Sequence, residues 1–449
     1  MKVKVINRNE EAFTKERAGD VKKVHRNYDP ELHHFSKATE YARALNAAKL
    51  ERVFAKPFVA ALPHADGVTA LARNPRRLNS LVAGSADGEI RIWDIPSERP
   101  LRRLLGHVGA VRGLAFAPGG EAAVSAGADA SVKLWKVPYA PFEAGDVCAD
   151  QGPALEFGGK HAFRGIDHHW CRDAFATAGA TVELWDHGRS EPVGSFSWGS
   201  DSVVAVRFNP AEPDIFASTG TDRSIALYDL RSGTPLRKLV MQTRCNALAW
   251  NPMEAFNFTV ANEDCNLYSY DMRKLSSATC VHKDFVSAVI DVDYSPTGRE
   301  FVAGGYDRTV RIFSFAAGRS RDVYHTKRMQ RVAAVKFSGD GSYVFSGSDD
   351  MNVRVWKAEA SEQLGVTLPR EKHKQAYQKA LVERYKHLPE VKRIVRHRHV
   401  PKAVYKATKT RRAVQDSDKR KLSNRIKHSA PGAVAVKPER KKKIIAEVE

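Results

Sequence analysis

His107 and Asp129 are residue types that general acid–base catalysis uses, and two turns read Gly-Ser-x-Asp, which could suggest a hydrolase or a phosphate site. These turns recur at the same point of a repeated pattern, so hairpin geometry explains them better. The chain has no Gly-x-x-x-x-Gly-Lys-Ser/Thr loop, no Gly-x-Ser-x-Gly turn and no His-Glu-x-x-His pair. We therefore predict a non-catalytic protein without cofactor or metal site, in which His107 and Asp129 are structural.

A second set of residues could bind phosphate groups. Residues 391–400 contain no acidic side chain, and Val391, Ile394 and Val395 form the apolar side of a short predicted helix there. Such a helix can dock on protein through its apolar side while its cations contact RNA phosphates. We predict RNA or ribonucleoprotein contact; the alternative is a solvated helix face. The cations are Lys392, Arg393, Arg396, Arg398 and Lys402, followed by Arg411 and Arg412.

The elements that position these residues follow from a pattern repeated seven times. Each copy has a small-residue turn, usually with an acid, and then an alternating apolar run that ends in an aromatic residue. The steps between the aromatics are 42, 50, 43, 42, 43 and 43 residues. A period of about 40–45 residues with a Trp-Asp-like ending is typical of WD-repeat propellers, with four strands per blade. The aromatics are Trp93, Trp135, Trp185, Tyr228, Tyr270, Phe313 and Trp356.

We therefore predict an all-β, seven-bladed propeller with helical extensions at both ends. The third copy lacks the turn acid and follows a longer connection, 138–163, which we interpret as an insertion between blades. Exposed sheet edges are a liability, so residues 58–62 should complete the seventh blade beside residues 352–356. The predicted structural repeat residues are His107, Asp129, Trp135, Trp93 and Trp356.

Charge is distributed unevenly along the 449 residues. The net charge is +20, yet residues 61–360 carry 34 basic and 35 acidic side chains, whereas residues 361–449 carry 25 and 9. A neutral platform with basic ends suggests a polyanionic partner. The five cysteines form no Cys-x-x-Cys motif, which argues against a disulfide framework or a zinc site. We expect neither a signal peptide nor a membrane span.

The sequence divides into an N-terminal extension, 1–57, the propeller, 58–358, and a basic helical segment, 359–449, that we expect to be partly disordered. Asp29-Pro30 and Ser36 are helix-entry signals, and Tyr41, Leu45 and Ala48 lie at helical spacing. They predict a helix of roughly 12–16 residues before Pro57, packed on the propeller or on a partner. In the C-terminal segment, Pro369 stands where the first turn of another helix would begin.

Several strings that propeller packing does not require resemble the Sof family of WD-repeat proteins. The resemblance covers nearly the whole chain and departs at His34, where a Pro is expected, and after about Arg411, where the end is shorter and more divergent. The strings are DPELHHF with EYARALNAAKLERVFAKPF near the N-terminus, FRGID at 163–167, SWGSD at 197–201, WNPMEAFNFTVANED at 250–264, YHTKRMQ at 324–330 and LPEVKRIVRHRHVPK at 388–402.

The resemblance implies a scaffold of the small-subunit processome, associated with the U-three small nucleolar ribonucleoprotein. Its location would be the nucleus, in the nucleolus. The protein would support processing of the small-subunit rRNA precursor and ribosome biogenesis by binding RNA and other processome proteins. Other components would cleave the precursor. Lys419-Arg420-Lys421 and residues 440–443 could serve nuclear import. No membrane or small-molecule partner is expected.

The alternative is a substrate receptor of a cullin-four RING ubiquitin ligase. Some WD-repeat receptors carry a Trp-Asp-x-Arg ending that contacts the ligase's adaptor. Here two successive repeats keep the Asp and the Arg, at Asp229 and Arg231 and at Asp271 and Arg273, but Tyr replaces the Trp. Such pairs often simply join within the turn at the strand end, which is the structural interpretation of the same residues.

Overall fold

The computed structural model describes residues 34–137, 152–198 and 201–448. The predicted helix entry at Asp29-Pro30 and most of the predicted insertion at 138–163 lie outside these residues. The described chain divides into two compact units, residues 56–362 with 398 onward, and the helices of residues up to 55 with 363–397. Each unit is described separately below.

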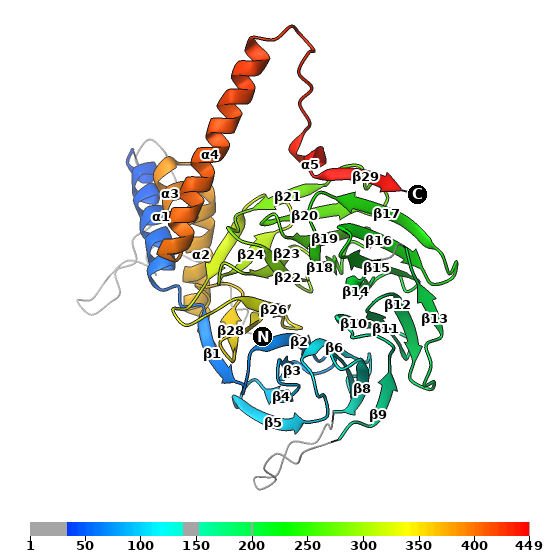
Figure 1. Cartoon of the computed structure of the whole chain (residues 1–449). Coiled ribbons are helices and arrows are strands. Elements are labelled where there is room, and N and C mark those ends of the chain that lie inside the picture. Colours follow the sequence, from blue (N-terminus) through cyan, green and yellow to red (C-terminus); the bar gives the residue numbers. More distant parts are fainter. Residues whose placement is uncertain (1–33, 138–151, 199–200, 449) are drawn as a thin grey trace, which may run out of the picture. The chain divides into compact units, whose positions relative to one another are not determined.

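Seven antiparallel sheets surround an axis in the first unit, which confirms the predicted propeller (Figure 1). The first three blades comprise β2 (Val68–Arg73), β3 (Ser80–Ser85), β4 (Ile90–Asp94) and β5 (Arg99–Leu104); β6 (Val111–Phe116), β7 (Ala122–Gly127), β8 (Ser131–Lys136) and β9 (Leu155–Gly158); and β10 (Gly165–His168), β11 (Ala174–Ala178), β12 (Val182–Asp186) and β13 (Gly194–Phe196). Strand β9 thus occupies part of the connection that we interpreted as an insertion.

The next three blades comprise β14 (Val203–Phe208), β15 (Ile215–Gly220), β16 (Ser224–Asp229) and β17 (Pro235–Met241); β18 (Cys245–Trp250), β19 (Asn257–Asn262), β20 (Asn266–Asp271) and β21 (Cys280–Lys283); and β22 (Val289–Tyr294), β23 (Glu300–Gly305), β24 (Val310–Ser314) and β25 (Ser320–Tyr324). Blade 7 comprises β26 (Val332–Phe337), β27 (Tyr343–Ser348), β28 (Asn352–Lys357) and, as its outer strand, β1 (Phe58–Pro63).

The pairing of β1 with β28 closes the propeller as predicted. Phe58 stands opposite Trp356 and Leu62 opposite Val353. The Phe58 and Trp356 rings also pack edge to face, with their centroids 5.7 Å apart. The chain's beginning therefore covers an edge that its end would otherwise expose.

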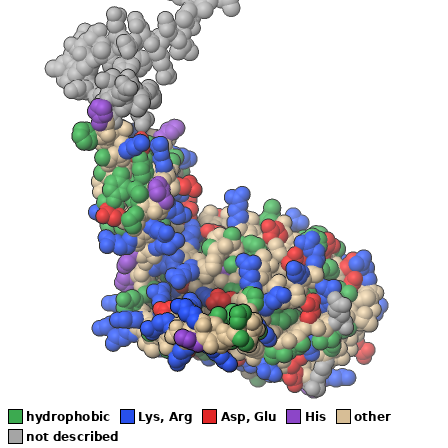
Figure 2. Space-filling model, turned by 90° about the horizontal axis from the view of Figure 1, so that it is seen from above, with side chains coloured by type: hydrophobic (Ala, Val, Ile, Leu, Met, Phe, Trp, Pro, Cys, Tyr) green, Lys and Arg blue, Asp and Glu red, His purple; other side chains and the backbone are tan. Residues whose placement is uncertain are grey.

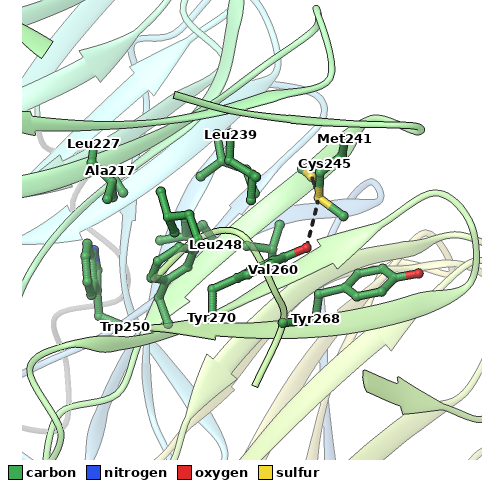
Figure 3. Packing of buried hydrophobic residues seen from close by; sticks show 14 residues of the cluster. Ala217, Leu227, Leu239, Met241, Cys245, Leu248, Trp250, Val260, Tyr268 and Tyr270 are labelled. Atoms are coloured by element: carbon green, nitrogen blue, oxygen red, sulfur yellow. Dashed lines mark hydrogen bonds between the residues drawn. The ribbon is translucent and has the colours of Figure 1, made fainter. Parts of the chain in front are cut away.

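The core lies between neighbouring blades, because each blade has two faces to bury and no blade can cover both. One cluster joins blades 4 and 5: Leu239 and Met241 of β17 pack with Leu248 of β18 and Tyr270 of β20 (Figure 3). The Tyr270 hydroxyl points at the Met241 sulfur, 3.7 Å away. The aromatic residues that end the seven copies are all at most 2% exposed.

The acid of each turn between the second and third strands has a local geometric role. In blade 2 the Asp129 Oδ1 accepts the Ser131 backbone N–H at 3.2 Å, and the intervening Ala130 has a φ of 58°. Left-handed backbone is costly for residues other than glycine, and an Asp that bonds its own turn helps to hold it. The residue after the acid has positive φ in six blades: Gly88, Ala130, Arg223, Cys265, Arg308 and Met351.

The helical unit contains α1 (Ser36–Val53), α2 (Pro369–Tyr385) and α3 (Pro389–Arg396). Phe35 is the N-cap of α1 and no side chain caps it, so the prediction of Ser36 as N-cap is wrong. Helix α1 packs against the C-terminal helices of its own unit, because Glu40 accepts hydrogen bonds from Tyr385 at 2.8 Å and Arg384 at 3.2 Å. Pro369 begins α2 as predicted.

Three further elements follow in the propeller unit: α4 (Lys402–Lys427), α5 (Glu439–Lys442) and β29 (Ile444–Val448). Helix α4 projects from the propeller, and the chain returns to add β29 beside β17 as a fifth strand of blade 4 (Figure 1). None of the helices in the described ranges is long and apolar enough to span a membrane.

Candidate functional site

His107 and Asp129 belong to one directed chain of hydrogen bonds inside blade 2. The ionised Asp129 can only accept, so His107 Nδ1 donates to it over 2.9 Å. His107 Nε2 then accepts from the Ser125 hydroxyl at 2.7 Å, and that hydroxyl accepts from Trp135 Nε1 at 2.8 Å. Burial lowers the pKa of His107 in spite of the Asp129 carboxylate, so the imidazole is neutral. Every group already has a partner, which makes this a strand-joining network.

The other two predicted repeat tryptophans have comparable partners. Trp356 Nε1 donates to the Ser346 hydroxyl at 2.8 Å, whereas Trp93 Nε1 donates to His64 Nε2 at 2.9 Å. Sequence reasoning missed His64, which follows β1 and reaches blade 1 only because β1 closes the propeller. Burial lowers the pKa of His64 to about 3. The one available signal was that a buried indole N–H needs an acceptor.

The Asp–Arg pairs at the ends of β16 and β20 form the same closed turn. Arg231 Nη2 lies 3.1 Å from Asp229 Oδ2, and Arg273 Nη2 lies 2.8 Å from Asp271 Oδ2. Hydrogen bonds from the arginines lower the pKa of both carboxyl groups. The two arginine side chains are nevertheless 71% and 63% exposed. The pairs are thus both structural turns and exposed cations in adjacent blades.

These turns and the acid-containing turns lie on opposite faces of the propeller. Neighbouring strands of a blade are antiparallel, so the turn between strands two and three points the same way as the connection to the next blade. We call that side the linker face. The turns that hold Arg231 and Arg273 join strands three and four, and they point to the other side.

Helix α3 presents the first group of predicted cations to solvent. Lys392, Arg393 and Arg396 are exposed, while Val391 is fully buried on the opposite side of the helix. The Arg52 side chain of α1 also donates to the Val395 carbonyl at 2.5 Å, which fixes the end of α3. The predicted amphipathic arrangement is therefore present, with its apolar side packed within the helical unit.

Arg398 and Arg411 make hydrogen bonds to the propeller. Arg398 is half-buried, with Nε 3.0 Å from the Arg321 carbonyl and Nη1 3.3 Å from Asp284 Oδ2. Arg411 donates to the backbone carbonyls of Phe285, at 2.7 Å, and Asp264, at 3.1 Å. Arg411 is thus bound on the linker face, and Arg398 is bound where blades 5 and 6 adjoin. These bonds tether the C-terminal segment, and the phosphate contacts predicted for Arg398 and Arg411 stay a prediction.

The remaining predicted cations, Lys402 and Arg412, lie exposed on α4. This helix carries ten Lys or Arg residues and two acidic ones, Asp416 and Asp418. Sequence reasoning missed its extent because only one of its residues, Val404, is buried, so no apolar stripe marks it. Lys and Arg side chains outnumber Asp and Glu over the face of the molecule drawn in Figure 2.

The return segment is tied to blades 4 and 5 of the propeller. The Gln242 backbone N–H donates to the Lys443 carbonyl at 3.0 Å, and the Ala278 N–H donates to the Arg440 carbonyl at 3.0 Å. In β29, Glu447 stands opposite Leu239 of β17. The chain is therefore anchored within α4, through Arg411, and again after it, through α5 and β29.

The described side chains offer no obvious metal centre. Among residues 34–137, 152–198 and 201–448, no three His, Cys, Asp or Glu side chains are grouped so that they could hold an ion. His168 and His187 approach to 3.0 Å between their Nε2 atoms, and burial lowers the pKa of His168 to about 4. A neutral pair that shares one proton explains this contact.

The sequence repeats and the seven blades together define a WD-repeat propeller. Comparison with known proteins agrees with this fold. The model of the WD domain, G-beta repeat, matches residues 57–94, 98–136, 277–314 and 322–357, and a Sof1-like domain matches residues 358–444.

The chain belongs to the Sof1-like family of WD-repeat proteins. It is 49% identical over 450 residues to DDB1- and CUL4-associated factor 13 of Xenopus laevis and 48% identical over 449 residues to the protein of that name in Homo sapiens, with both chains of each pair fully covered. It is 45% identical over 469 residues to Protein SOF1 of Saccharomyces cerevisiae, covering all of this chain and 95% of that one.

Proposed function

We propose that this protein is a non-catalytic scaffold of the small-subunit processome. It associates with the U-three small nucleolar ribonucleoprotein in the nucleolus and supports processing of the small-subunit rRNA precursor. The similarity to yeast Protein SOF1 along the whole chain supports this role. The cleavage chemistry belongs to other components, since the His107 network has no free acid, base or nucleophile.

One observation carries the proposal: exposed cations are concentrated in the C-terminal segment beside a propeller with almost no net charge. Lys392, Arg393 and Arg396 occupy one side of α3, and Val391 holds the other side in the helical unit. Cations fixed in this way can replace the counterions of RNA phosphates without any rearrangement of the helix. The exposed faces of the propeller are then free for neighbouring proteins.

Co-purification tests this function directly. The tagged protein should capture precursor rRNA and the U-three small nucleolar RNA from a nuclear extract, and it should sediment with large pre-ribosomal particles. Nuclease treatment before capture distinguishes RNA-dependent from protein-dependent association. A protein that captures neither RNA, with or without crosslinking, contradicts the proposal.

A second candidate function is that of a substrate receptor for a cullin-four ubiquitin ligase. The name of the vertebrate relatives, DDB1- and CUL4-associated factor 13, and the exposed arginines of two adjacent blades favour it. Changing Arg231 and Arg273 to Ala should then abolish capture of the ligase adaptor and leave precursor rRNA capture intact. Retained adaptor capture would mean that both arginines serve their turns alone.

A further inference from the structure

Helix α4 is oriented by residues at helical spacing on one side. Val404 is buried, and Thr408 and Arg411 are half-buried. Residues separated by three or four positions share one face of a helix, so these three define the side that faces the propeller. The Arg411 bonds to Phe285 and Asp264 place that side on the linker face of blades 5 and 6.

A different side of α4 carries an exposed stripe of three cations and one aromatic residue. Lys402, Tyr405, Lys409 and Arg412 follow one another at spacings of three, four and three residues. With about 100° per residue, these four side chains fall within roughly 80° of the helix circumference and span about 15 Å. All four are exposed, and Tyr405 is 61% exposed. We call this set the 402–412 stripe.

The stripe has no partner among the described residues. None of its three cations forms an ion pair with a carboxylate in the described ranges, and the stripe ends at Asp416, the next residue in the same direction. Arg398, just before α4, is bound to Asp284, and the His399 ring stacks on His325 with centroids 5.3 Å apart. The stripe is thus held in place by groups that do not belong to it.

The neighbouring connection between blades 6 and 7 adds charge of the same sign. It begins at His325, on which His399 stacks, and it exposes Lys327 and Arg328. His399 is three residues before Lys402, so this connection continues the cationic surface from α4 onto the propeller.

We propose that the 402–412 stripe binds a single-stranded segment of RNA, with Tyr405 stacked on a base and Lys402, Lys409 and Arg412 on phosphates. This inference rests on the proposed function and names its RNA contact. Base stacking on an exposed aromatic residue flanked by cations is the usual way in which proteins hold unpaired nucleotides. An acidic protein would pair with the cations, but it would not account for the exposed Tyr405 ring.

Purified full-length protein and a labelled oligouridine of about 20 nucleotides, longer than most single-strand sites, test the proposal. Three phosphate contacts predict a slope of about −2 for log affinity against log salt. Lys402→Glu, Lys409→Glu and Arg412→Glu together should weaken binding by at least about tenfold and flatten this slope. The matched control changes Lys419, Lys421 and Arg425 to Glu on the same helix, beyond Asp416, and should keep most of the affinity.

Tyr405 gives an independent test, because the contribution of its ring to the affinity does not depend on charge. Tyr405→Ala should weaken binding of oligouridine about tenfold, while Tyr405→Phe restores it. On an abasic oligomer of the same length, Tyr405→Ala should bind as the unchanged protein does. Circular dichroism confirms that each variant keeps its helices.

Two results would overturn the proposal. Equal loss of affinity in the 402–412 triple variant and in the control triple variant would show nonspecific electrostatic attraction and no specific site. A 402–412 triple that leaves pre-ribosomal particles yet binds oligouridine normally would show that the stripe meets an acidic protein. Either result leaves the proposed function intact, because capture of precursor rRNA by the unchanged protein is measured separately.

Discussion

Polar side chains play opposite roles in the propeller interior and on the C-terminal helices. In the interior, His64, His107 and Ser125 are buried, and each meets a specific partner in its own blade or the next. On α3 and α4, by contrast, Lys392 and Lys409 are exposed. Polar groups of the interior therefore join strands, whereas the charged side chains of the C-terminal extension remain exposed and can bind a partner.

The largest expected effect concerns the interior. Burial lowers the pKa of His64 to about 3 and that of His168 and His282 to about 4, from an ordinary value of 6.5. The unfolded chain therefore binds up to three more protons near pH 5, so the free energy of unfolding should fall with acidity, by up to about 4 kcal/mol per pH unit. Stability is fully present above pH 6.5 and is lost as pH falls toward 4. Denaturant titrations at several pH values measure it.

His64→Asn isolates one contribution to that slope. The amide cannot be protonated, so the pH dependence should weaken by about a third. The same change at His428, which is exposed on the protein surface, is the matched control. An unchanged slope in His64→Asn would mean that this imidazole is not buried in neutral form.

A smaller effect is expected at the tethers, which lie between the two regions. Arg411→Ala removes two charge-assisted hydrogen bonds to the Phe285 and Asp264 carbonyls, worth about 1.5–3 kcal/mol each at most. The loss should free α4 without unfolding the blades. Faster amide exchange in residues 402–412, with an unchanged melting temperature of the propeller, is the expected result. Arg412→Ala, the exposed neighbour, serves as the control and should leave exchange unaltered.

The smallest effect is expected at the exposed turns. Arg231→Ala and Arg273→Ala remove cations that solvent already surrounds, and exposed ion pairs contribute little to stability. The melting temperature of the double variant should equal that of the unchanged protein. A clear drop in the melting temperature would mean that these arginines contribute to stability as the interior network does.

The repeats were predictable because they are local and periodic. Seven spaced aromatics and alternating strands indicated the blades, and the open edge of blade 7 required β1. The tethers were not predictable, because a single Arg398 or Arg411 in a basic run looks like any other until its carbonyl acceptors are known. Strand β29 was missed for a similar reason: it is a short strand that pairs with β17, about 200 positions away in the chain.

The same limit applies to the contacts of the predicted cations. The amphipathic pattern around Val391 correctly separated the buried side of α3 from Lys392, Arg393 and Arg396. It had nothing to say about residues beyond Pro401, where α4 has almost no apolar side. Net charge therefore located the segment, but only the contacts separate tethers from available cations.

One measurement tests the central claim that exposed cations of the extension, and not the propeller interior, hold the protein in its particle. Lys392→Glu, Arg393→Glu and Arg396→Glu together should release the protein from pre-ribosomal particles in gradient sedimentation and abolish crosslinking of this segment to RNA. The propeller should keep its melting temperature, because these residues lie in the helical unit. A triple variant that still co-sediments with the large particles would contradict the account.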